Sequence, residues 1–249
     1  MSDNTKDFQF RKDDKDKAFD IAVMKKYVQT KQELDKLLEV LITPFIQNKS
    51  VRILDACCGI GHIIYWLRQI SPQSTFAGFD STPYLIDEAK QLCPYDNVEF
   101  KVADVHKLHE VYEPKSFDIT INWKTLSWLP RYEPAMKELV QVTRQHIFLS
   151  SLFFDGDIDF EIKVREYQSE AGKEGFNAYY NVYSYPRFED YCYSLGAKAV
   201  VPSDFEIGID LPPPAYNRMG TYTVRLEDGR RLQICGAVVH NWKVIRIDL

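Results

Sequence analysis

The chain has 249 residues, of which 45% are hydrophobic and 27% are charged, and its formal net charge is -5. This length and composition predict one domain with a sizeable core, and no linker rich in Pro, Gly or Ser divides the chain. Acidic and basic residues are interleaved, which argues against an extended nucleic-acid surface because such a surface needs a concentrated basic patch. No apolar run approaches the roughly 20 residues of a membrane span, and the charged residues 1–16 differ from a signal peptide.

The cysteine pattern favours a reducing compartment. The chain contains Cys57, Cys58, Cys93, Cys192 and Cys235, an odd number with no Cys-x-x-Cys pair. We therefore expect reduced thiols in a cytoplasmic protein without membrane attachment.

The N-terminal part is expected to be helical after a charged start. Residues 1–15 are expected to be disordered, whereas residues 13–45 place apolar side chains at helical spacing and predict one or two amphipathic helices. Tyr27 lies on the apolar face of this segment. A core position is the ordinary explanation for such a tyrosine, and a place in a ligand pocket is the alternative.

The most informative stretch is residues 51–61, with the sequence VRILDACCGIG. The apolar run predicts a buried parallel strand that ends at Asp55, and the apolar periodicity of residues 63–70 predicts a helix after the loop. Gly59 and Gly61 allow a tight turn and a close approach of another molecule to the main chain. The helix beyond the turn presents unpaired N–H groups at its start.

This loop differs from a dinucleotide-binding loop in two ways. Ile64 stands where the Gly-x-Gly-x-x-Gly pattern has its third glycine. The carboxylate of Asp55 is unfavourable beside a phosphate but suits an ammonium group or hydroxyls. The loop therefore favours a cationic or zwitterionic nucleoside.

A second acid follows at the spacing expected for a ribose ligand. Residues 75–80 predict a strand that ends at Asp80, about 20 residues after Gly59. Ser81 and Thr82 supply hydroxyls at the start of the next helix, which has proline in its first turn. A capping role in the turn is the alternative for Asp80.

Two more predicted strands end in polar residues. Residues 98–102 precede Asp104 and Val105, and residues 117–123 contain Asn122 and Trp123 near their end. For Asp104, as for Asp80, the alternative to ligand binding is a structural role as the cap of a helix or turn. Agreement among four strand ends is much harder to reach by chance than one glycine-rich loop.

The segment LDACCGIGH at 54–62, with these downstream strand ends, resembles the class I S-adenosylmethionine-dependent methyltransferases. That family usually has glycine where Cys57 stands. The resemblance implies that S-adenosylmethionine binds at the strand ends, that Asp80 contacts the ribose, that Asp104 and Val105 contact the adenine, and that the fourth strand end faces the methionine part. The implied cofactor-binding residues are Asp55, Ala56, Cys57, Gly59, Gly61, Asp80, Ser81, Asp104, Val105 and Asn122.

The predicted fold is α/β, a Rossmann-like seven-stranded methyltransferase sheet with helices on both faces and an antiparallel last strand. The expected single domain comprises disordered residues 1–15, a helical lid at 16–48, a cofactor-binding half at 49–153 and a substrate-side half at 154–249. Within the last half, residues 186–195 predict a helix, 197–201 a strand and 242–248 the final strand. Asp228-Gly229 predicts a hairpin added between residues 221–226 and 231–235.

The substrate-side half begins after a predicted helix at 133–145 and a fifth strand at 146–153. An acidic loop follows at 155–161, and its alternating carboxylates lack the spacing of a calcium loop, so no metal site is predicted. Asp155 is the candidate general base, because it directly follows the fifth strand and strand ends face the ligand crevice in open α/β sheets. No histidine is selected among His62, His106, His109, His146 and His240.

An aromatic-rich segment at 167–185 is the expected wall of the acceptor pocket, since tyrosine offers an apolar face and a hydroxyl. Packing within a small core of its own is the alternative. The predicted pocket residues are Tyr27, Trp123, Tyr179, Tyr180, Tyr183 and Arg218.

The predicted reaction is methyl transfer to an oxygen or nitrogen of a small molecule. The tail, with DLPP at 210–213 and RMGTYT at 218–223, resembles methyltransferases of polysaccharide clusters, and this resemblance implies a sugar or glycan precursor as the acceptor. The alternatives are a tRNA or protein methyltransferase and, from another class, a regulatory protein that binds the cofactor without turnover. The oligomeric state is left open.

Overall fold

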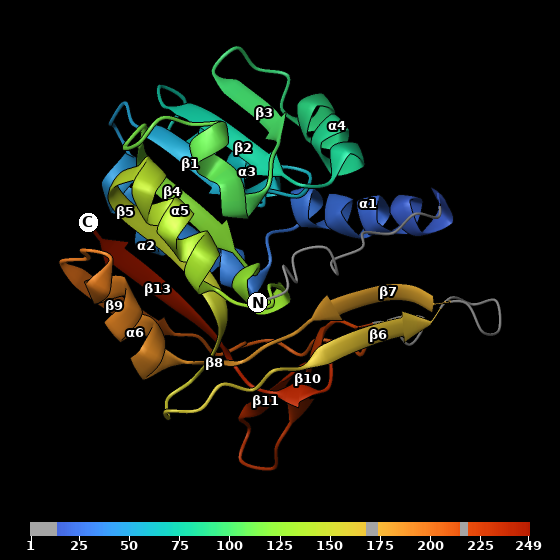
Figure 1. The fold of residues 1–249 in the computed structure, drawn as a ribbon. Coiled ribbons are helices and arrows are strands. Elements are labelled where there is room, and N and C mark those ends of the chain that lie inside the picture. The colour runs from blue at the N-terminus through green and yellow to red at the C-terminus, as the bar shows by residue number, and fades with distance from the viewer. Residues whose placement is uncertain (1–13, 168–173, 215–218) are drawn as a thin grey trace.

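A twisted sheet of parallel strands with one antiparallel insertion forms the centre of the molecule (Figure 1). The computed structural model describes residues 14–167, 174–214 and 219–249. Seven strands follow the order β3-β2-β1-β4-β5-β13-β9, and a short strand, β8, pairs with β5. Their bounds are β1 Arg52–Ala56, β2 Thr75–Asp80, β3 Val98–Val102, β4 Phe117–Trp123, β5 Thr143–Phe154, β8 Tyr183–Ser184, β9 Ala199–Asp204 and β13 Trp242–Asp248.

The strand directions confirm the predicted fold class. Strands β1 to β5 pair in parallel, whereas β13 is antiparallel to both β5 and β9. Parallel strands place all their carboxyl ends at one edge of the sheet. Asp55, Asp80 and Asn122 therefore meet at the same edge although they come from three strands.

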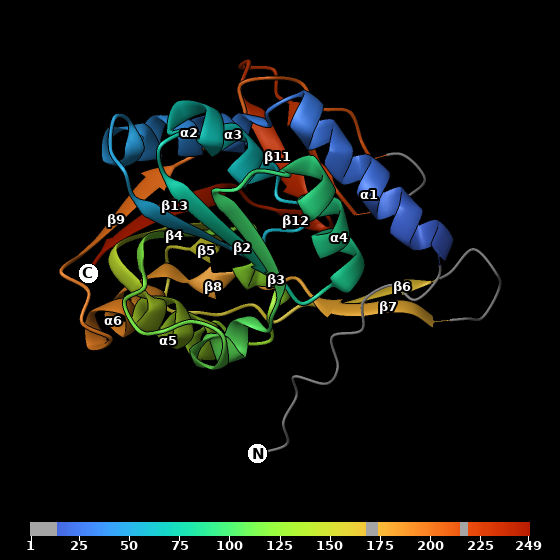
Figure 2. The same cartoon turned by 90° about the horizontal axis from the view of Figure 1, so that it is seen from above.

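Helices cover both faces of the sheet (Figure 2). On one face lie α2 and α3, with α4 beside them, and on the other lie α5 and α6. Their bounds are α2 Glu33–Ile46, α3 His62–Ile70, α4 Pro83–Leu92, α5 Glu133–Val142 and α6 Tyr185–Ser194, with short 3-10 turns η2 at Val105–Glu110 and η3 at Leu126–Trp128.

Alternation along the strands divides the core in two. Ile53 packs into the cluster with α2 and α3, and the next residue, Leu54, packs into the cluster with α5 and α6. Successive strand side chains point to opposite faces, so a continuous apolar run fills both layers. The same alternation places Phe76 on the first layer and Phe79 on the second.

Two helices precede the sheet. Helix α1 spans Asp14–Gln29 and packs mainly against α3 and α4. Lys25 of α1 pairs with Glu88 of α4 at 2.7 Å. The expectation of disorder for residues 1–15 lies almost entirely outside the described residues, while residues 14 and 15 belong to α1. No helix in the described ranges is long and apolar enough to cross a membrane.

Two strand boundaries differ from the sequence-based expectation. β5 begins at Thr143, inside the segment predicted as helix, because Thr143 pairs with Phe117 of β4 and its hydroxyl lies 2.6 Å from that of Thr120. β9 runs from Ala199 to Asp204, later than predicted, because antiparallel pairing with β13 continues as far as Lys243. In both cases pairing with a distant strand overrides the local pattern.

Two small sheets lie beyond the central one (Figure 1). Strands β6 (Lys163–Tyr167) and β7 (Glu174–Tyr179) form an antiparallel ribbon, and β10 (Thr221–Arg225), β11 (Arg231–Cys235) and β12 (Val238–Val239) form a three-stranded sheet. The predicted hairpin is confirmed by the pairing of Val224 with Leu232, and Gly229 in its turn has φ +87°. The ribbon was not predicted from the sequence.

Gly78 of β2 provides a test of how tightly β2, β3 and the loop after β1 are packed. A Cβ at Gly78 would lie 2.6 Å from the Phe100 ring and 3.0 Å from Cys58 Sγ. We expect Gly78→Ala to lower the free energy of unfolding by about 1–3 kcal/mol, because overpacking forces ring and backbone shifts. Urea unfolding measures this change. Gly208→Ala is the control, since nothing lies within 4 Å of its Cβ position, and an equal loss in both variants would contradict this account.

Candidate functional site

The loop between β1 and α3 is built for close approach to its main chain. Cys57, Gly59 and Gly61 have φ of 62°, 54° and 76°, so three residues of the turn adopt left-handed backbone. A Cβ at Gly61 would lie 2.9 Å from the Phe100 ring, which makes glycine necessary there. Cys57 occupies a position with the conformation that glycine favours, which accounts for the family preference.

Asp80 ties this loop to the start of α4. Its carboxylate oxygens accept hydrogen bonds from Gly59 N at 3.0 Å and from Thr82 N at 3.0 Å. Burial raises the pKa of Asp80, while the hydrogen bonds from Thr82 and Gly59 oppose the shift. Ser81 follows at the surface. The carboxylate is therefore fixed at the end of β2, where it has both the structural role and the position expected for a ribose ligand.

Asp55 and Asn122 offer open polar atoms next to the loop. Asn122 Nδ2 donates to Ala56 O at 3.1 Å, but Asn122 Oδ1 and Asp55 Oδ2 are buried without a hydrogen-bond partner among the described residues. Burial raises the pKa of Asp55 to about 8, with further contributions from Asp80 and Asp35. Buried polar atoms are normally satisfied, so these two acceptors indicate a ligand that donates hydrogen bonds or carries positive charge.

Asp104 caps η2 at the end of β3. Its Oδ1 accepts from His106 N at 2.9 Å and lies 2.8 Å from His106 Nδ1. The hydrogen bond from the His106 side chain lowers the pKa of Asp104, and this effect outweighs partial burial, which would raise that pKa. The Asp104 side chain is 45% exposed, and Val105 is buried. The adenine contact predicted for these two residues stays a prediction.

A buried polar cluster, which we call the Asp35 cluster, joins α2 to the site and was missed by sequence analysis. Asp35 Oδ1 accepts from Trp123 Nε1 at 2.9 Å and from Lys124 Nζ at 3.1 Å, and Asp35 Oδ2 lies 3.7 Å from His62 Nε2. Gln32 completes the Asp35 cluster by accepting from Lys124. Burial would raise the pKa of Asp35, but Lys124, His62 and the hydrogen bonds outweigh it and lower that pKa.

A signal for this cluster exists in the sequence. Asp35 falls on the same face of α2 as Leu38 and Ile42, and all three are buried. An acid within the apolar stripe of a helix needs a partner of opposite charge or a hydrogen-bond donor. That requirement points to a distant partner without identifying it.

Two of the predicted pocket residues lie at the Asp35 cluster. Trp123 belongs to it, and the Tyr27 ring lies 5.7 Å from the His62 ring and 5.8 Å from Lys124 Nζ. Burial raises the pKa of Tyr27 despite a hydrogen bond with Gln32. Met24, one turn earlier on α1, would contact a Cβ at Gly59 at 3.5 Å. Helix α1 therefore covers both the loop and the cluster.

The tyrosines of the aromatic segment have different environments. Tyr183 requires a correction, because its hydroxyl is bonded to Leu126 O at 3.2 Å and Leu129 O at 2.6 Å and its ring packs on Tyr132 in the α5–α6 core. Tyr180 packs on Trp128 at 5.0 Å, and Tyr179 is a buried residue at the end of β7. Arg218 lies outside the described residues.

Asp155 is engaged at the surface. Its Oδ1 accepts from Lys243 Nζ at 2.7 Å, and its side chain is 77% exposed, so it faces a lysine and solvent. The next acids of the loop are also occupied, since Asp157 pairs with Arg187 and Asp159 accepts from Ser184 N at 2.6 Å. No group of three or more potential metal ligands occurs within residues 14–167, 174–214 and 219–249.

Known proteins with similar sequences are methyltransferases. The chain is 27% identical over 111 residues to malonyl-acyl carrier protein O-methyltransferase of Bacillus cereus, covering 45% of this chain and 40% of that protein. It is 26% identical over 142 residues to trans-aconitate 2-methyltransferase of Escherichia coli, covering 53% of this chain and 54% of that protein. The chain thus matches only about half the length of these curated relatives.

Solved structures share the fold at low sequence identity. Magnesium protoporphyrin IX methyltransferase from Synechocystis PCC 6803, solved with S-adenosylhomocysteine, aligns with a TM-score of 0.54 at 13% identity over 87% of this chain and 82% of that one. The 4+2 cyclase SpnF aligns with a TM-score of 0.58 at 14% identity, over 86% of this chain and 80% of that one.

The family model described as a methyltransferase domain matches residues 47–173, just over half of the 249 residues. That range includes β1 to β5, the glycine loop and all three buried strand-end residues Asp55, Asp80 and Asn122. The chain therefore belongs to the methyltransferase-domain family.

Proposed function

We propose that the protein binds S-adenosylmethionine at the carboxyl edge of the sheet and transfers its methyl group to an oxygen or nitrogen of a small molecule. The observation that carries this proposal is the pair of open buried acceptors, Asp55 Oδ2 and Asn122 Oδ1, beside a glycine loop with left-handed backbone. A cationic nucleoside with an ammonium group complements these atoms. Family membership supports the same ligand.

The residues present fit this ligand by charge and by shape. Asp55, Asp80 and Asp35 place three buried carboxyl groups at one edge, where a cation would favour their ionised forms, and Gly59 and Gly61 leave two positions of the loop without side chains. The bound sulfonium supplies an already activated methyl group, so the protein needs mainly to orient the acceptor. Such a transfer requires no catalytic triad.

The acceptor is proposed to be a small molecule. The relatives' names give a malonyl group on a carrier protein and trans-aconitate, both of which are carboxylic acids, and give no support to a sugar or glycan. The net charge of -5 disfavours tRNA as the acceptor. Binding without methyl transfer is the second candidate, since the 4+2 cyclase SpnF has a similar fold and a name that denotes another reaction.

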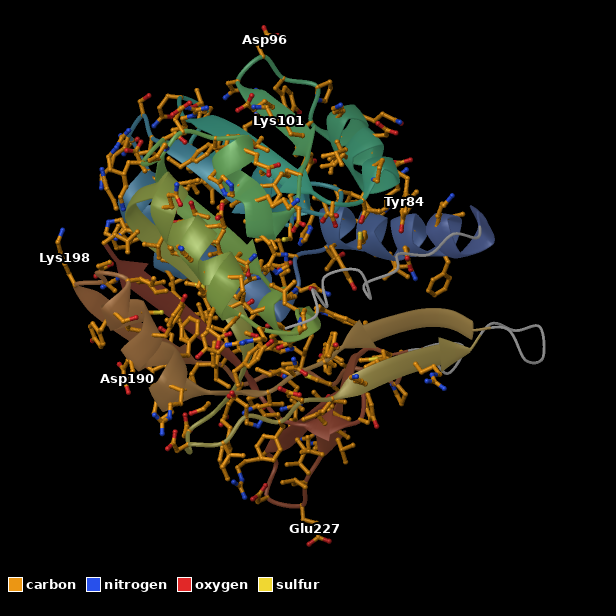
Figure 3. All side chains as sticks on the ribbon, viewed as in Figure 1. Tyr84, Asp96, Lys101, Asp190, Lys198 and Glu227 are labelled. Carbon is orange, nitrogen blue, oxygen red and sulfur yellow. The ribbon has the colours of Figure 1, made fainter. Side chains whose placement is uncertain are left out.

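A substitution at Asp80 tests whether its carboxylate contributes to cofactor binding. We expect Asp80→Ala to weaken S-adenosylmethionine binding by about 10- to 100-fold, the worth of hydrogen bonds to a charged group. Isothermal titration calorimetry measures the dissociation constant. Asp96→Ala is the matched control, because Asp96 lies at the outer tip of the loop before β3 (Figure 3). Unchanged affinity in a folded Asp80→Ala protein would refute the ribose role.

The raised pKa of Asp55 makes stability depend on pH. Its pKa is near 4 in the unfolded chain and about 8 in the ligand-free fold, so the folded state binds the extra proton between these values. The stability from protonated Asp55 is full below pH 4 and is lost as pH rises through about 8. We expect the unfolding free energy of the wild type, relative to Asp55→Asn, to fall by up to about 1.4 kcal/mol per pH unit across that window.

Urea unfolding of both proteins at several pH values between 5 and 9 measures this difference. Asp190→Asn is the control, since Asp190 is an exposed acid on α6 (Figure 3). A constant difference between the wild type and Asp55→Asn across the whole range would contradict the raised pKa.

The class of acceptor is tested with methyl-labelled cofactor. Incubation of the protein with labelled S-adenosylmethionine and fractionated cell extract is expected to place label in the small-molecule fraction. The Asp80→Ala protein, which is expected to bind the cofactor weakly, controls for background transfer. Label in RNA or protein would overturn the small-molecule acceptor, and binding without transfer in any fraction would favour the second candidate.

A further inference from the structure

The Asp35 cluster gathers one acid, one base and one imidazole from three separate elements. Asp35 belongs to α2, His62 is the first residue of α3, and Lys124 follows β4 directly. Trp123 and Gln32 fix the acid and the lysine by hydrogen bonds. Such a convergence of charged groups in a buried place is not needed to fold a sheet, because apolar residues would pack there at lower cost.

Two atoms of the Asp35 cluster have no hydrogen-bond partner within the described part of the chain. They are Asp35 Oδ2 and His62 Nε2, both buried, and they lie 3.7 Å apart, beyond hydrogen-bond distance. Burial lowers the pKa of His62 to about 4, against the opposite effect of Asp35, so the imidazole is neutral at pH 7. With the ring proton on Nδ1, His62 accepts at Nε2, so Nε2 and Asp35 Oδ2 can both receive hydrogen bonds from one donor group with several N–H bonds.

The Asp35 cluster is continuous with the cofactor loop. His62 follows Gly61 in sequence, and the charge of Asp35 contributes to the raised pKa of Asp55. Asn122, with its open Oδ1, and Trp123 are the last two residues of β4, and Lys124 follows them directly. The open atoms of the loop and those of the Asp35 cluster therefore belong to one site, and the cluster is its end nearest the N-terminal helices.

The Asp35–Lys124 ion pair is complementary to an α-amino acid, which carries an ammonium group and a carboxylate on one carbon. If the ion pair opens, each member exchanges its partner for the opposite charge on the ligand, so neither charge stays buried alone. That exchange avoids the large cost of an unpaired buried charge. Gln32 and Trp123 can hold the two side chains in place while their partner changes.

Building on the proposed function, we propose that Asp35, His62 and Lys124 bind the amino-acid end of the methyl donor. The ammonium group donates to Asp35 Oδ2 and to His62 Nε2, and the carboxylate accepts from Lys124 Nζ. This assignment adds α2 and the residue after β4 to the binding site. It makes the N-terminal helices a direct part of cofactor recognition.

The test compares two thioethers that differ in the amino-acid end. S-adenosylhomocysteine carries that end, and 5′-methylthioadenosine has a methyl group in its place. By calorimetry we expect the wild type to bind S-adenosylhomocysteine at least 10-fold more tightly. Lys124→Met and Asp35→Asn are each expected to weaken S-adenosylhomocysteine at least 10-fold while changing 5′-methylthioadenosine affinity less than 3-fold.

Lys36→Met is the matched control, since Lys36 is an exposed lysine next to Asp35 in α2 whose Nζ pairs with Glu33 at 2.5 Å. Equal wild-type affinity for the two thioethers would overturn the proposal whether or not the variants fold. Unchanged S-adenosylhomocysteine affinity in both variants would also overturn it. If the variants lose affinity for both thioethers equally, the Asp35 cluster has a structural role only and the proposal is overturned.

The outcomes separate this inference from the proposed function. A wild type that binds S-adenosylmethionine, together with variants that bind S-adenosylhomocysteine normally, refutes only the role of the Asp35 cluster. A wild type that binds neither the methyl donor nor its product at millimolar concentration refutes both.

Discussion

Three acidic side chains buried at one edge of the sheet are the constraint on which the site depends. Asp35, Asp55 and Asp80 are each less than 10% exposed, and their fields act on one another through a poorly solvated region. Each acid is accommodated differently. Asp80 accepts two backbone N–H groups, Asp35 has Lys124 and Trp123, and Asp55 has a raised pKa of about 8. A bound cation would relieve all three at once.

The two-layer core is what allows this arrangement to persist. The strand ends are held by packing on both faces, with Ile53 and Leu54 in opposite layers. Because the apolar layers supply most of the stability, an unfavourable charge at the edge can be tolerated. The loop after β1 adds rigidity of its own, since Cys58 N donates to Phe79 O at 2.8 Å and Gly61 N donates to Cys58 O at 2.9 Å.

The sequence was most informative where the determinants are local. Asp55, Gly59, Gly61 and Asp80 fall within 26 residues, and the rule that parallel strands end at one edge places them together. Asp35 and Lys124 are 89 residues apart, and their meeting depends on how α2 packs on the sheet, which periodicity alone does not define. The environment of Tyr183 was not predictable for the same reason, because its hydroxyl partners, the carbonyls of Leu126 and Leu129, lie in and directly after η3, 54 to 57 residues away.

Two residues of the same site have strained backbone. Cys57 and Lys124 have φ of 62° and 58°, in the left-handed region that costs a residue with a side chain about 1–2 kcal/mol. Lys124 is held there by hydrogen bonds from its N–H to Ser150 O at 3.1 Å and to Ser150 Oγ at 3.0 Å. The strained conformation brings the Lys124 side chain to Asp35. Asn48 and Lys115, which precede β1 and β4 at the opposite edge of the sheet, have the same left-handed backbone, so strain by itself does not locate the site. At Cys57 and Lys124 it coincides with the buried acids, and there the surroundings hold both residues in the conformation that the site requires.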